Sequence, residues 1–574
     1  MATRKELAEK HSFLKESIFH LKVYGLTVQH VIRNRNSGIK RFEDAGNLLS
    51  YPIVSTSKSE LWNKDDNAEN WIMTAGKIQN LRLAASRING VEIPAGELFS
   101  FWKYVGKPSK KNGYIIGREI REGCIVPSIG GGLCQLSNAL YDAAVKAGFQ
   151  IVERHKHSQV VKGSLAEQDR DATIKWNYLD LRFCSDEAFR IEIEMDVDYL
   201  YVRIRSKQKD NPLLNVQYVP EIPPSPLNDC YSCWNTDCYI CNTKDKISNT
   251  GVTSYILDDR WPEYERYVND NVKDRDYVLA PLSDSALKLL GKESQKWKIE
   301  KGRKIYYQKE ALKRLYSFHK NKGGNLFSWQ LGADEPLVRS IIRKIPVETT
   351  HLVVAHNMLP FLYKYFALGG RTYDVLMTRS SIRKLQAHLD VAYNRYKDSP
   401  TLCDFRAPER IMLLEDKALA GVSKIITAHK KVAGEFDGAV KLDWVLHPIQ
   451  AKTGGKKILF PASLLARKGA YEIRRLAEEL NIKFVVHGRA VEYPDFLSCE
   501  HTQGDVFDNV GLVILPAYVE NRPQLILKAI SQGIPVIISD ACGISPQENV
   551  IVVPTGDYDI LKERVKEMCR LLDI

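Results

Sequence analysis

Four cysteines near the middle of the chain have the spacing of metal ligands. Cys230, Cys233, Cys238 and Cys241 form two C-x2-C pairs separated by four residues. Each pair can chelate through two thiolates, and four thiolates complete a tetrahedral zinc site. An iron–sulfur cluster, or four reduced cysteines without metal, would use the same residues. We expect structural zinc first, because a metal would tie down a proline-rich segment that has little core of its own.

A second group of reactive residues centres on Cys134, which follows three consecutive glycines at the start of a predicted helix, residues 134–149. A helix N-terminus stabilises negative charge and glycines leave backbone amides accessible, so this position favours a thiolate. His155, His157 and Asp171 follow, and a thiol nucleophile needs a histidine and an orienting carboxylate. The first expectation for this region is a packing or ligand-binding role. A thiol-based acyl-transfer or hydrolytic site is the alternative.

Charged residues also stand at strand-to-helix junctions in the last third of the chain. Arg467, Lys468 and Gly469 lie between the apolar run KKILFP and a predicted helix, and Glu520 and Asn521 follow the apolar run VGLVILP. A diphosphate binds where the amides of a helix N-terminus meet cations at the carboxyl edge of a parallel sheet. These positions predict a binding site for a diphosphate group. The alternative is that they are surface charges at helix starts.

The elements that position these residues fall into distinct regions. After residue 252, short apolar runs alternate with helical segments, which predicts parallel sheets covered on both faces. His356 follows one of these predicted strands and is a candidate catalytic residue, and the alternative for this histidine is a structural role. Residues 211–230 contain five prolines and predict an extended linker. Residues 189–205 alternate apolar and polar types, which predicts two antiparallel strands.

The length, composition and net charge of the chain limit its possible domain organisation and binding partners. The 574 residues are too many for one hydrophobic core, so several domains are expected. The net charge of +12 fits anionic small molecules such as nucleotide sugars, or peripheral attraction to an anionic membrane. No nucleic-acid module is recognisable. Neither a secretory signal nor a membrane-spanning apolar stretch is present, which predicts a cytoplasmic protein.

The N-terminal motifs resemble a known family. FSFWKYVGKP, GYIIGREIREG, PSIGGGLCQLSNALYDAAVKAGF and IVERHKHSQVV occur in the order found in the VanW family, named for a gene in glycopeptide-resistance clusters. The resemblance covers about residues 75–205 and implies a cell-envelope or other glycan-related context. It implies no particular reaction.

The C-terminal motifs KKILFPASLLARKGAYEI and LPAYVENRPQLILKAISQGIPVIISD resemble family 4 glycosyltransferases of the GT-B fold. The resemblance implies that Lys468, with Gly469 after it, binds the donor diphosphate and that Glu520 contacts the donor. Two positions depart from the family pattern: Ser463 stands in place of an arginine, for which Arg467 is a neighbouring substitute, and Lys528 stands in place of a second glutamate.

We therefore expect an α/β multidomain protein with an N-terminal α+β VanW-like domain, a four-cysteine metal-binding linker and a C-terminal GT-B fold of two Rossmann-like domains. The expected domains are residues 1–210, 211–251, 252–445 and 446–574. The predicted function is glycosyl transfer from a nucleotide sugar to an unknown acceptor, of the retaining type. The alternatives are a degenerate nucleotide-sugar-binding module beside a working Cys134 site, and a non-catalytic scaffold.

Overall fold

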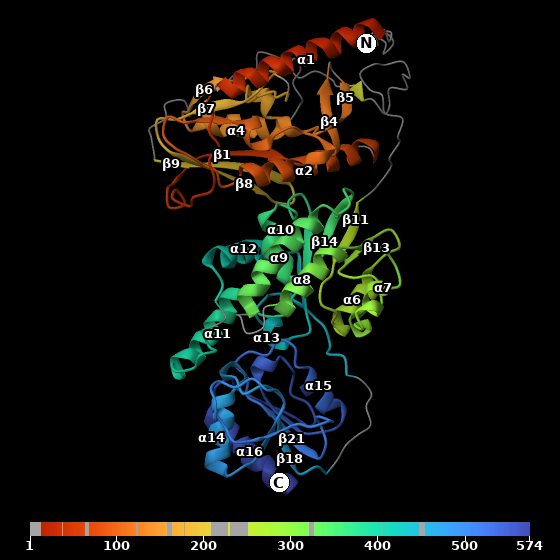
Figure 1. Ribbon diagram of the computed structural model, residues 1–574, viewed down its shortest axis with the longest axis vertical. Coiled ribbons are helices and arrows are strands. Elements are labelled where there is room, and N and C mark those ends of the chain that lie inside the picture. Colours follow the sequence, from red (N-terminus) through yellow and green to blue (C-terminus); the bar gives the residue numbers. More distant parts are fainter. Residues whose placement is uncertain are drawn as a thin grey trace. The chain divides into compact units, whose positions relative to one another are not determined.

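The computed structural model (Figure 1) describes the chain in several stretches that belong to two compact units. The first unit comprises residues 1–252, 345–350 and 364–372, and the second comprises residues 253–344, 351–363 and 373–574. The four cysteines of the predicted metal site lie outside the described residues. The described residues are 13–36, 38–62, 68–121, 124–157, 164–176, 178–207, 228–229, 251–320, 326–403, 406–446 and 454–574.

The described part of the first unit contains three β-sheets. Their strands are β1 (Ile53–Glu60), β2 (Glu92–Ile93), β3 (Leu98–Ser100), β4 (Ile116–Arg121), β5 (Cys124–Ile129), β6 (Gln150–Glu153), β7 (Arg182–Cys184), β8 (Phe189–Met195), β9 (Tyr199–Ser206) and β10 (Asn228–Asp229). The sheet orders are β1-β9-β8-β2, β3-β7-β6 and β10-β5-β4. The antiparallel β8–β9 pair confirms the hairpin predicted from alternation, because Leu200, Val202 and Ile204 point into the core at 0% exposure.

The described helices of the first unit are α1 (Phe13–Asn36), α2 (Ala68–Ile88), α3 (Phe101–Val105) and α4 (Leu133–Lys146). Both α2 and α4 contact the four-stranded sheet and each other, and their apolar faces share one core with it. The helix predicted to begin near Cys134 is confirmed as α4, which begins one residue earlier. This helix has Cys134 in its first turn.

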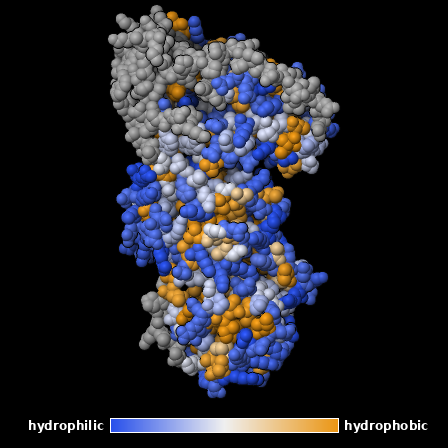
Figure 2. All heavy atoms as spheres, turned by 180° about the vertical axis from the view of Figure 1, so that it is seen from behind, coloured by the Kyte–Doolittle hydropathy of each residue, from blue (hydrophilic) through white to orange (hydrophobic). Residues whose placement is uncertain are grey.

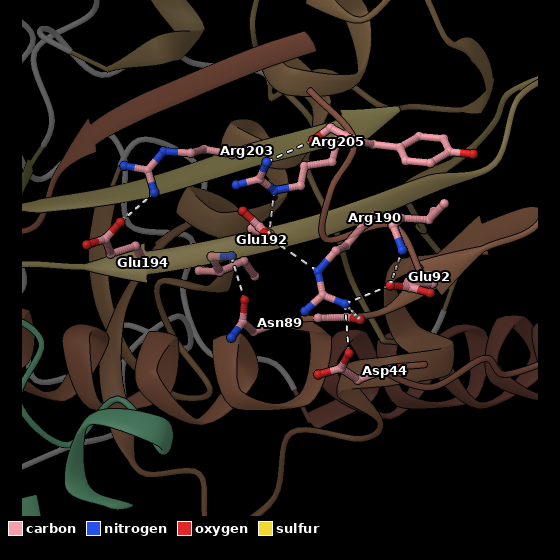
Figure 3. A network of polar contacts seen from close by, with 12 residues as sticks. Asp44, Asn89, Glu92, Arg190, Glu192, Glu194, Arg203 and Arg205 are labelled. Carbon is pink, nitrogen blue, oxygen red and sulfur yellow. Dashed lines mark hydrogen bonds and ion pairs between the residues drawn. The ribbon is translucent and has the colours of Figure 1, made fainter. Parts of the chain in front are cut away.

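A charged network fastens the chain before β1 to the same sheet (Figure 3). The buried guanidinium of Arg190 on β8 binds Asp44 at 2.7 Å, Glu92 at 2.9 Å and Glu192 at 3.3 Å. Arg205 on β9 reaches Glu192 at 2.9 Å. A buried guanidinium is tolerated when carboxylates surround it, and here it connects three chain segments.

The second unit contains two parallel sheets. The strands of the first are β11 (Val252–Ile256), β12 (Tyr277–Ala280), β13 (Arg303–Tyr306), β14 (Thr349–Ala355), β15 (Thr372–Leu376), β16 (Lys424–Thr427) and β17 (Val440–Lys441), and those of the second are β18 (Lys457–Phe460), β19 (Phe484–Val486), β20 (Glu500–His501), β21 (Val510–Leu515), β22 (Val536–Ser539) and β23 (Val550–Val553). Their orders are β13-β12-β11-β14-β15-β16-β17 and β20-β19-β18-β21-β22-β23. Both begin with the 3-2-1-4-5-6 arrangement of doubly wound folds, so each has a switch point beside its first strand.

Helices cover the two parallel sheets (green and blue in Figure 1). They are α6 (Pro262–Asn271), α7 (Asp284–Leu289), α8 (Gln308–Lys320), α9 (Leu326–Ile342), α10 (Leu359–Lys364), α11 (Ile382–Arg395), α12 (Glu409–Ala420), α13 (Lys430–Ala433), α14 (Ala470–Leu480), α15 (Gln524–Ser531) and α16 (Tyr558–Leu572). All six residues of β21 are buried, as expected for a strand with helices on both faces. The predicted strand–helix alternation of the last third is confirmed.

The surface mixes residue types (Figure 2). Hydrophilic residues cover most of the visible face, and hydrophobic residues form separate groups between them. Within the described ranges, no helix is both long enough and apolar enough to cross a bilayer.

Candidate functional sites

The first candidate site lies where α4 begins. Gly132 caps the helix with φ 95°, and no side chain caps the free amides of its first turn. The half-buried Cys134 places its Sγ 4.0 Å from the carbonyl oxygen of Ile174. Farther along α4, Ser137 Oγ donates to Ala172 O at 2.5 Å. The start of α4 therefore lies against residues 171–174.

The same segment connects α4 to the two histidines. Thr173 N donates to His155 O at 2.7 Å, which places residues 155–157 beside Asp171–Ile174. Both the ring Nδ1 and the backbone N–H of His157 bind the carboxylate of Asp171, whose side chain is almost fully buried. The imidazole of His157 also contacts the Cys134 thiol. Cys134, His157 and Asp171 thus converge.

His155 has a different partner. Its Nε2 lies 3.3 Å from Glu153 Oε1, and its side chain is 39% exposed. The two histidines would share a face only if both lay on a strand, but β6 ends at Glu153. Beyond that residue the backbone is irregular, so the two rings find separate carboxylates.

The charge state of His157 follows from its surroundings. Burial of the imidazole acts to lower its pKa, but the hydrogen bonds to Asp171 and Cys134 outweigh burial and raise the pKa to about 10. His157 is therefore an imidazolium at neutral pH. Arg154 supports the arrangement, since its Nε donates to Asp171 O at 2.6 Å and its Nη2 to Asp169 at 2.8 Å.

The second candidate site lies at the switch point of the β18–β23 sheet. The loops after the adjacent strands β18 and β21 are tied together, because Arg467 O accepts from Tyr518 N at 2.9 Å and from Val519 N at 3.2 Å. Lys468 Nζ binds Glu520 Oε2 at 2.8 Å and Val519 O at 3.2 Å. Lys468 and Glu520, 52 positions apart in sequence, are thereby adjacent.

Glycine makes this close approach possible. Gly469 caps α14 with φ 87°, and a Cβ there would lie 2.4 Å from Pro516 O. No side chain caps this helix either. Asn521, half-buried, continues the same loop. The loop pair thus joins a cation, a carboxylate and an open helix N-terminus.

A histidine from the other parallel sheet contacts this loop. His429 follows β16, and its Nε2 donates to Glu520 O at 3.0 Å and to Ala541 O at 3.2 Å. Its Nδ1 accepts from Val432 N, so the neutral ring carries its proton on Nε2. Burial lowers the pKa of His429. The neutral His429 ring therefore donates a hydrogen bond that helps to position the loop containing Glu520.

Ser463 and Lys528, the two residues that depart from the glycosyltransferase pattern, have different surroundings. A Cβ on Gly488 would lie 2.4 Å from Ser463 Oγ, so the backbone of another loop comes close to the position expected to hold an arginine. Lys528 is exposed on α15, and Arg467 is half-buried in the turn before Gly469.

His356 lies in the interior of the second unit. It is fully buried, and its Nε2 lies 2.9 Å from Glu415 Oε1. Burial, and then the charge of Arg379, lower its pKa. Glu415 also accepts the backbone N–H of Ile382 and lies 3.3 Å from Arg379. This environment supports a structural role for His356.

The sequence analysis did not predict one polar cluster of the second unit. At the switch point beside β11, Arg314 binds Asp258 and Asp334, and Asn357 Nδ2 donates to the same two carboxylates at 2.8 and 3.1 Å. Burial raises the pKa of Asp334 to about 6, and the charge of Asp258 followed by burial raises that of Asp259. The available signal was the pair Asp258–Asp259 directly after a buried strand.

A hollow opens beside this cluster. Its empty volume is about 500 Å³, including space open to solvent. Asp258, Asp259, Lys292 and Arg314 supply its charged wall, and Trp297 and several aliphatic residues supply its apolar wall. Such a combination of polar and apolar lining is typical of small-molecule sites.

Comparison with known proteins finds a family match within the first unit. Residues 76–205 match the family described as VanW like protein. An uncharacterized protein of Bacillus subtilis, YoaR, is 36% identical over 104 residues, 18% of this chain and 34% of that protein. The vancomycin B-type resistance protein VanW of Enterococcus faecalis is 27% identical over 202 residues, 30% of this chain and 71% of that protein. This chain thus spans about a third of the Bacillus protein.

Solved structures similar to this chain include glycosyltransferases. Sucrose-phosphate synthase of Thermosynechococcus elongatus is 11% identical, with 57% of this chain and 91% of that chain covered and a TM-score of 0.34. The lipopolysaccharide outer core galactosyltransferase WaaB is 11% identical, with 55% of this chain and 90% of that chain covered and a TM-score of 0.32.

The family match reported above shows a VanW domain in residues 76–205 of this chain.

Proposed function

We propose that the second unit transfers a sugar from a nucleotide-sugar donor to an acceptor, in the retaining manner of family 4 glycosyltransferases. The observation that carries this proposal is the meeting of Lys468 and Glu520 at the switch point of the β18–β23 sheet. Ligands of open α/β sheets bind at this point, outside the carboxyl ends of the strands.

The donor site follows from the charges of the two loops. The Lys468 ammonium and the uncapped N-terminus of α14 attract the diphosphate. The diphosphate replaces Glu520 as the partner of Lys468, and the released carboxylate of Glu520 accepts hydroxyl groups of the donor. Asn521 and Arg467 lie in the same two loops. No metal is needed in this scheme, since cation and helix dipole together stabilise the departing diphosphate.

The hollow beside Asp258 supplies a place for the acceptor. It lies beyond the carboxyl ends of β11 and β12 in the other parallel sheet. The carboxyl group of Asp259, whose raised pKa retains a proton to higher pH than usual, lines it together with Lys292. Carboxyl and ammonium groups side by side suit a polyhydroxylated acceptor, in agreement with a glycan-related role.

Exposed Lys528 and small Ser463 separate this chain from the family pattern, so binding and transfer have to be measured separately. A degenerate binding module would retain nucleotide-sugar affinity and release no nucleoside diphosphate.

The experiment is a thermal-shift panel of UDP-, GDP- and TDP-sugars on the full chain, since a ligand that binds only the native state raises the melting temperature. For the stabilising donor, Lys468→Ala should raise Kd by about 5- to 150-fold, the equivalent of about 1–3 kcal/mol for a charge-assisted contact. Lys468→Arg, which keeps the charge, should lose less.

Lys566→Ala on α16, an exposed lysine outside the two loops, is the matched control and should leave Kd unchanged. Equal affinity in Lys468→Ala and in the control would rule out the donor site. Donor binding without release of nucleoside diphosphate, in the presence of a panel of glycan acceptors, would establish the binding-module alternative.

A further inference from the structure

We infer that the VanW domain contains a second, independent reaction centre, in which the Cys134 thiol is the nucleophile, His157 its base and Asp171 the residue that orients this base. The substrate class is a carbonyl compound with a leaving group: an ester, thioester or amide. This inference does not rest on glycosyl transfer by the second unit.

The geometry fulfils the requirements of a nucleophile–base–orienter arrangement. Nδ1 of His157 is held by Asp171, which leaves the other ring nitrogen for the thiol that the imidazole contacts. A second bond from the His157 backbone N–H to the same carboxylate fixes the residue relative to Asp171. Such double anchoring fixes the orientation of the ring, as the third member of a catalytic triad does.

The surroundings of Cys134 are electropositive. Cys134 lies in the first turn of a 14-residue helix that no side chain caps, which is the positive end of the helix dipole. The His157 imidazolium adds a full positive charge. Low-pKa, reactive cysteines occur in electropositive and partly exposed environments of this kind.

The site is also accessible. Cys134 is half-buried and the His157 side chain is 19% exposed, whereas the Asp171 side chain is 5% exposed. The nucleophile and base can therefore meet a substrate, while the orienting carboxylate is shielded from water. A purely structural histidine–aspartate pair has no need of a partly exposed thiol against its imidazole.

The reaction proceeds in two balanced steps. The Cys134 thiolate attacks the carbonyl carbon, the bond from that carbon to the leaving group breaks, and the leaving group takes the proton of the His157 imidazolium. The product is an acyl-thioester on Cys134. Water then attacks the thioester carbonyl while His157 accepts its proton, the carbon–sulfur bond breaks, and a carboxylic acid leaves. Backbone amides of the α4 first turn supply donors for the oxyanion.

The first test is the rate at which iodoacetamide alkylates each thiol of the full chain, followed by peptide mass spectrometry. A thiol with an ordinary pKa gains about fiftyfold in rate between about pH 6.5 and about pH 8.5, because its thiolate fraction rises from about 1% to about half. Cys134 should gain less than about threefold, and at about pH 6.5 it should react about tenfold faster than Cys403, an exposed cysteine of the same chain.

The chain offers a matched pair of variants. His157→Gln should slow Cys134 alkylation at about pH 6.5 by about tenfold and restore the ordinary pH dependence. His155→Gln, which removes a ring two positions away that pairs with Glu153, should leave both unchanged. Melting temperatures of both variants show whether the domain stays folded, and the pH profile of the unmodified chain decides the question even when a variant does not fold.

The second test is acylation by p-nitrophenyl acetate. The chain should release one equivalent of p-nitrophenolate in a burst and retain the acetyl group on Cys134, and Cys134→Ser should abolish the burst. Alkylation of Cys134 that follows Cys403 in pH dependence, or that is the same in both histidine variants, would overturn the inference. Rapid alkylation without acetylation of Cys134 would overturn the assignment to acyl chemistry.

Discussion

At the scale of single residues, the candidate histidines differ in their hydrogen-bond and ion-pair partners, although they are the same residue type. His155, His157, His356 and His429 are four histidines that follow strands, and their surroundings differ. His157 is paired with Asp171 and charged, whereas burial lowers the pKa of His356 and of His429. His155 lies exposed beside Glu153. The position of the nearest carboxylate and the depth of burial decide whether a histidine can act as a base or has a structural role.

The His157–Asp171 pair predicts a specific dependence of stability on pH. The pKa of His157 in the folded domain, about 10, lies above the unfolded value of about 6.5. The pair therefore contributes its full stabilisation below about pH 6.5 and loses it as the pH rises through about 10. Asp171→Asn should destabilise the first unit by about 2 kcal/mol near pH 6.

Thermal denaturation of both proteins from about pH 6 to about pH 10 checks this, and the difference in melting temperature should shrink toward the alkaline end. Asp169→Asn is the control on the same loop. The bonds of Asp169 to Arg154 and Lys156 overcome burial and lower its pKa, so its contribution is lost only in acid. A pH-independent effect of Asp171→Asn would contradict the charged pair.

At the scale of elements, both candidate sites use the same device. The helices α4 and α14 each begin at a glycine with positive φ, Gly132 and Gly469, and neither has a side-chain cap. A glycine there lets another backbone segment or side chain approach closely and leaves the first-turn amides open to a ligand. The helix start, rather than any one side chain, is therefore the common feature of the two sites.

This use of glycine predicts unequal costs for two similar substitutions in the last domain. Gly504 has φ 70°, and a Cβ at this position would have nothing within 4 Å, so Gly504→Ala should cost about 1–2 kcal/mol of backbone strain alone. Gly469→Ala adds a collision at 2.4 Å with Pro516 O, and should cost about 1–3 kcal/mol more and weaken donor binding. Urea denaturation measures the free energy of unfolding of both variants. Equal losses of stability would mean that the loops after β18 and β21 move apart at little energetic cost.

At the scale of the whole molecule, the chain joins two units with separate hydrophobic cores. One core fills the VanW domain and another fills the last parallel-sheet domain. Each unit has its own candidate site, and no residue of one is needed to complete the other. The glycosyl-transfer and thiol proposals can therefore succeed or fail independently.

The four-cysteine motif gives the third prediction of this Discussion. Metal analysis of the purified chain should find about one zinc per molecule, bound by Cys230, Cys233, Cys238 and Cys241. Replacing Cys233 and Cys238 together by serine should remove it, whereas Cys403→Ser, a cysteine outside the cluster, should not. A visible absorption band would instead indicate an iron–sulfur cluster. Metal-free wild-type chain would refute both.

The sequence by itself determined the local elements and the chemistry at their ends. The glycines before Cys134 predicted the start of α4, and the apolar runs predicted β18, β21 and the junctions at Lys468 and Glu520. These features depend on near neighbours, since a helix start or a buried strand is specified by residues a few positions apart.

Only the tertiary structure decided which distant groups meet. It placed His157 rather than His155 against Cys134, buried His356 against Glu415, and collected Asp258, Arg314 and Asp334 into a cluster that no spacing rule had indicated. Such contacts join positions tens of residues apart, and they depend on how whole elements pack. Periodicity does not encode that packing, because many arrangements of the same helices and strands bury the same apolar faces.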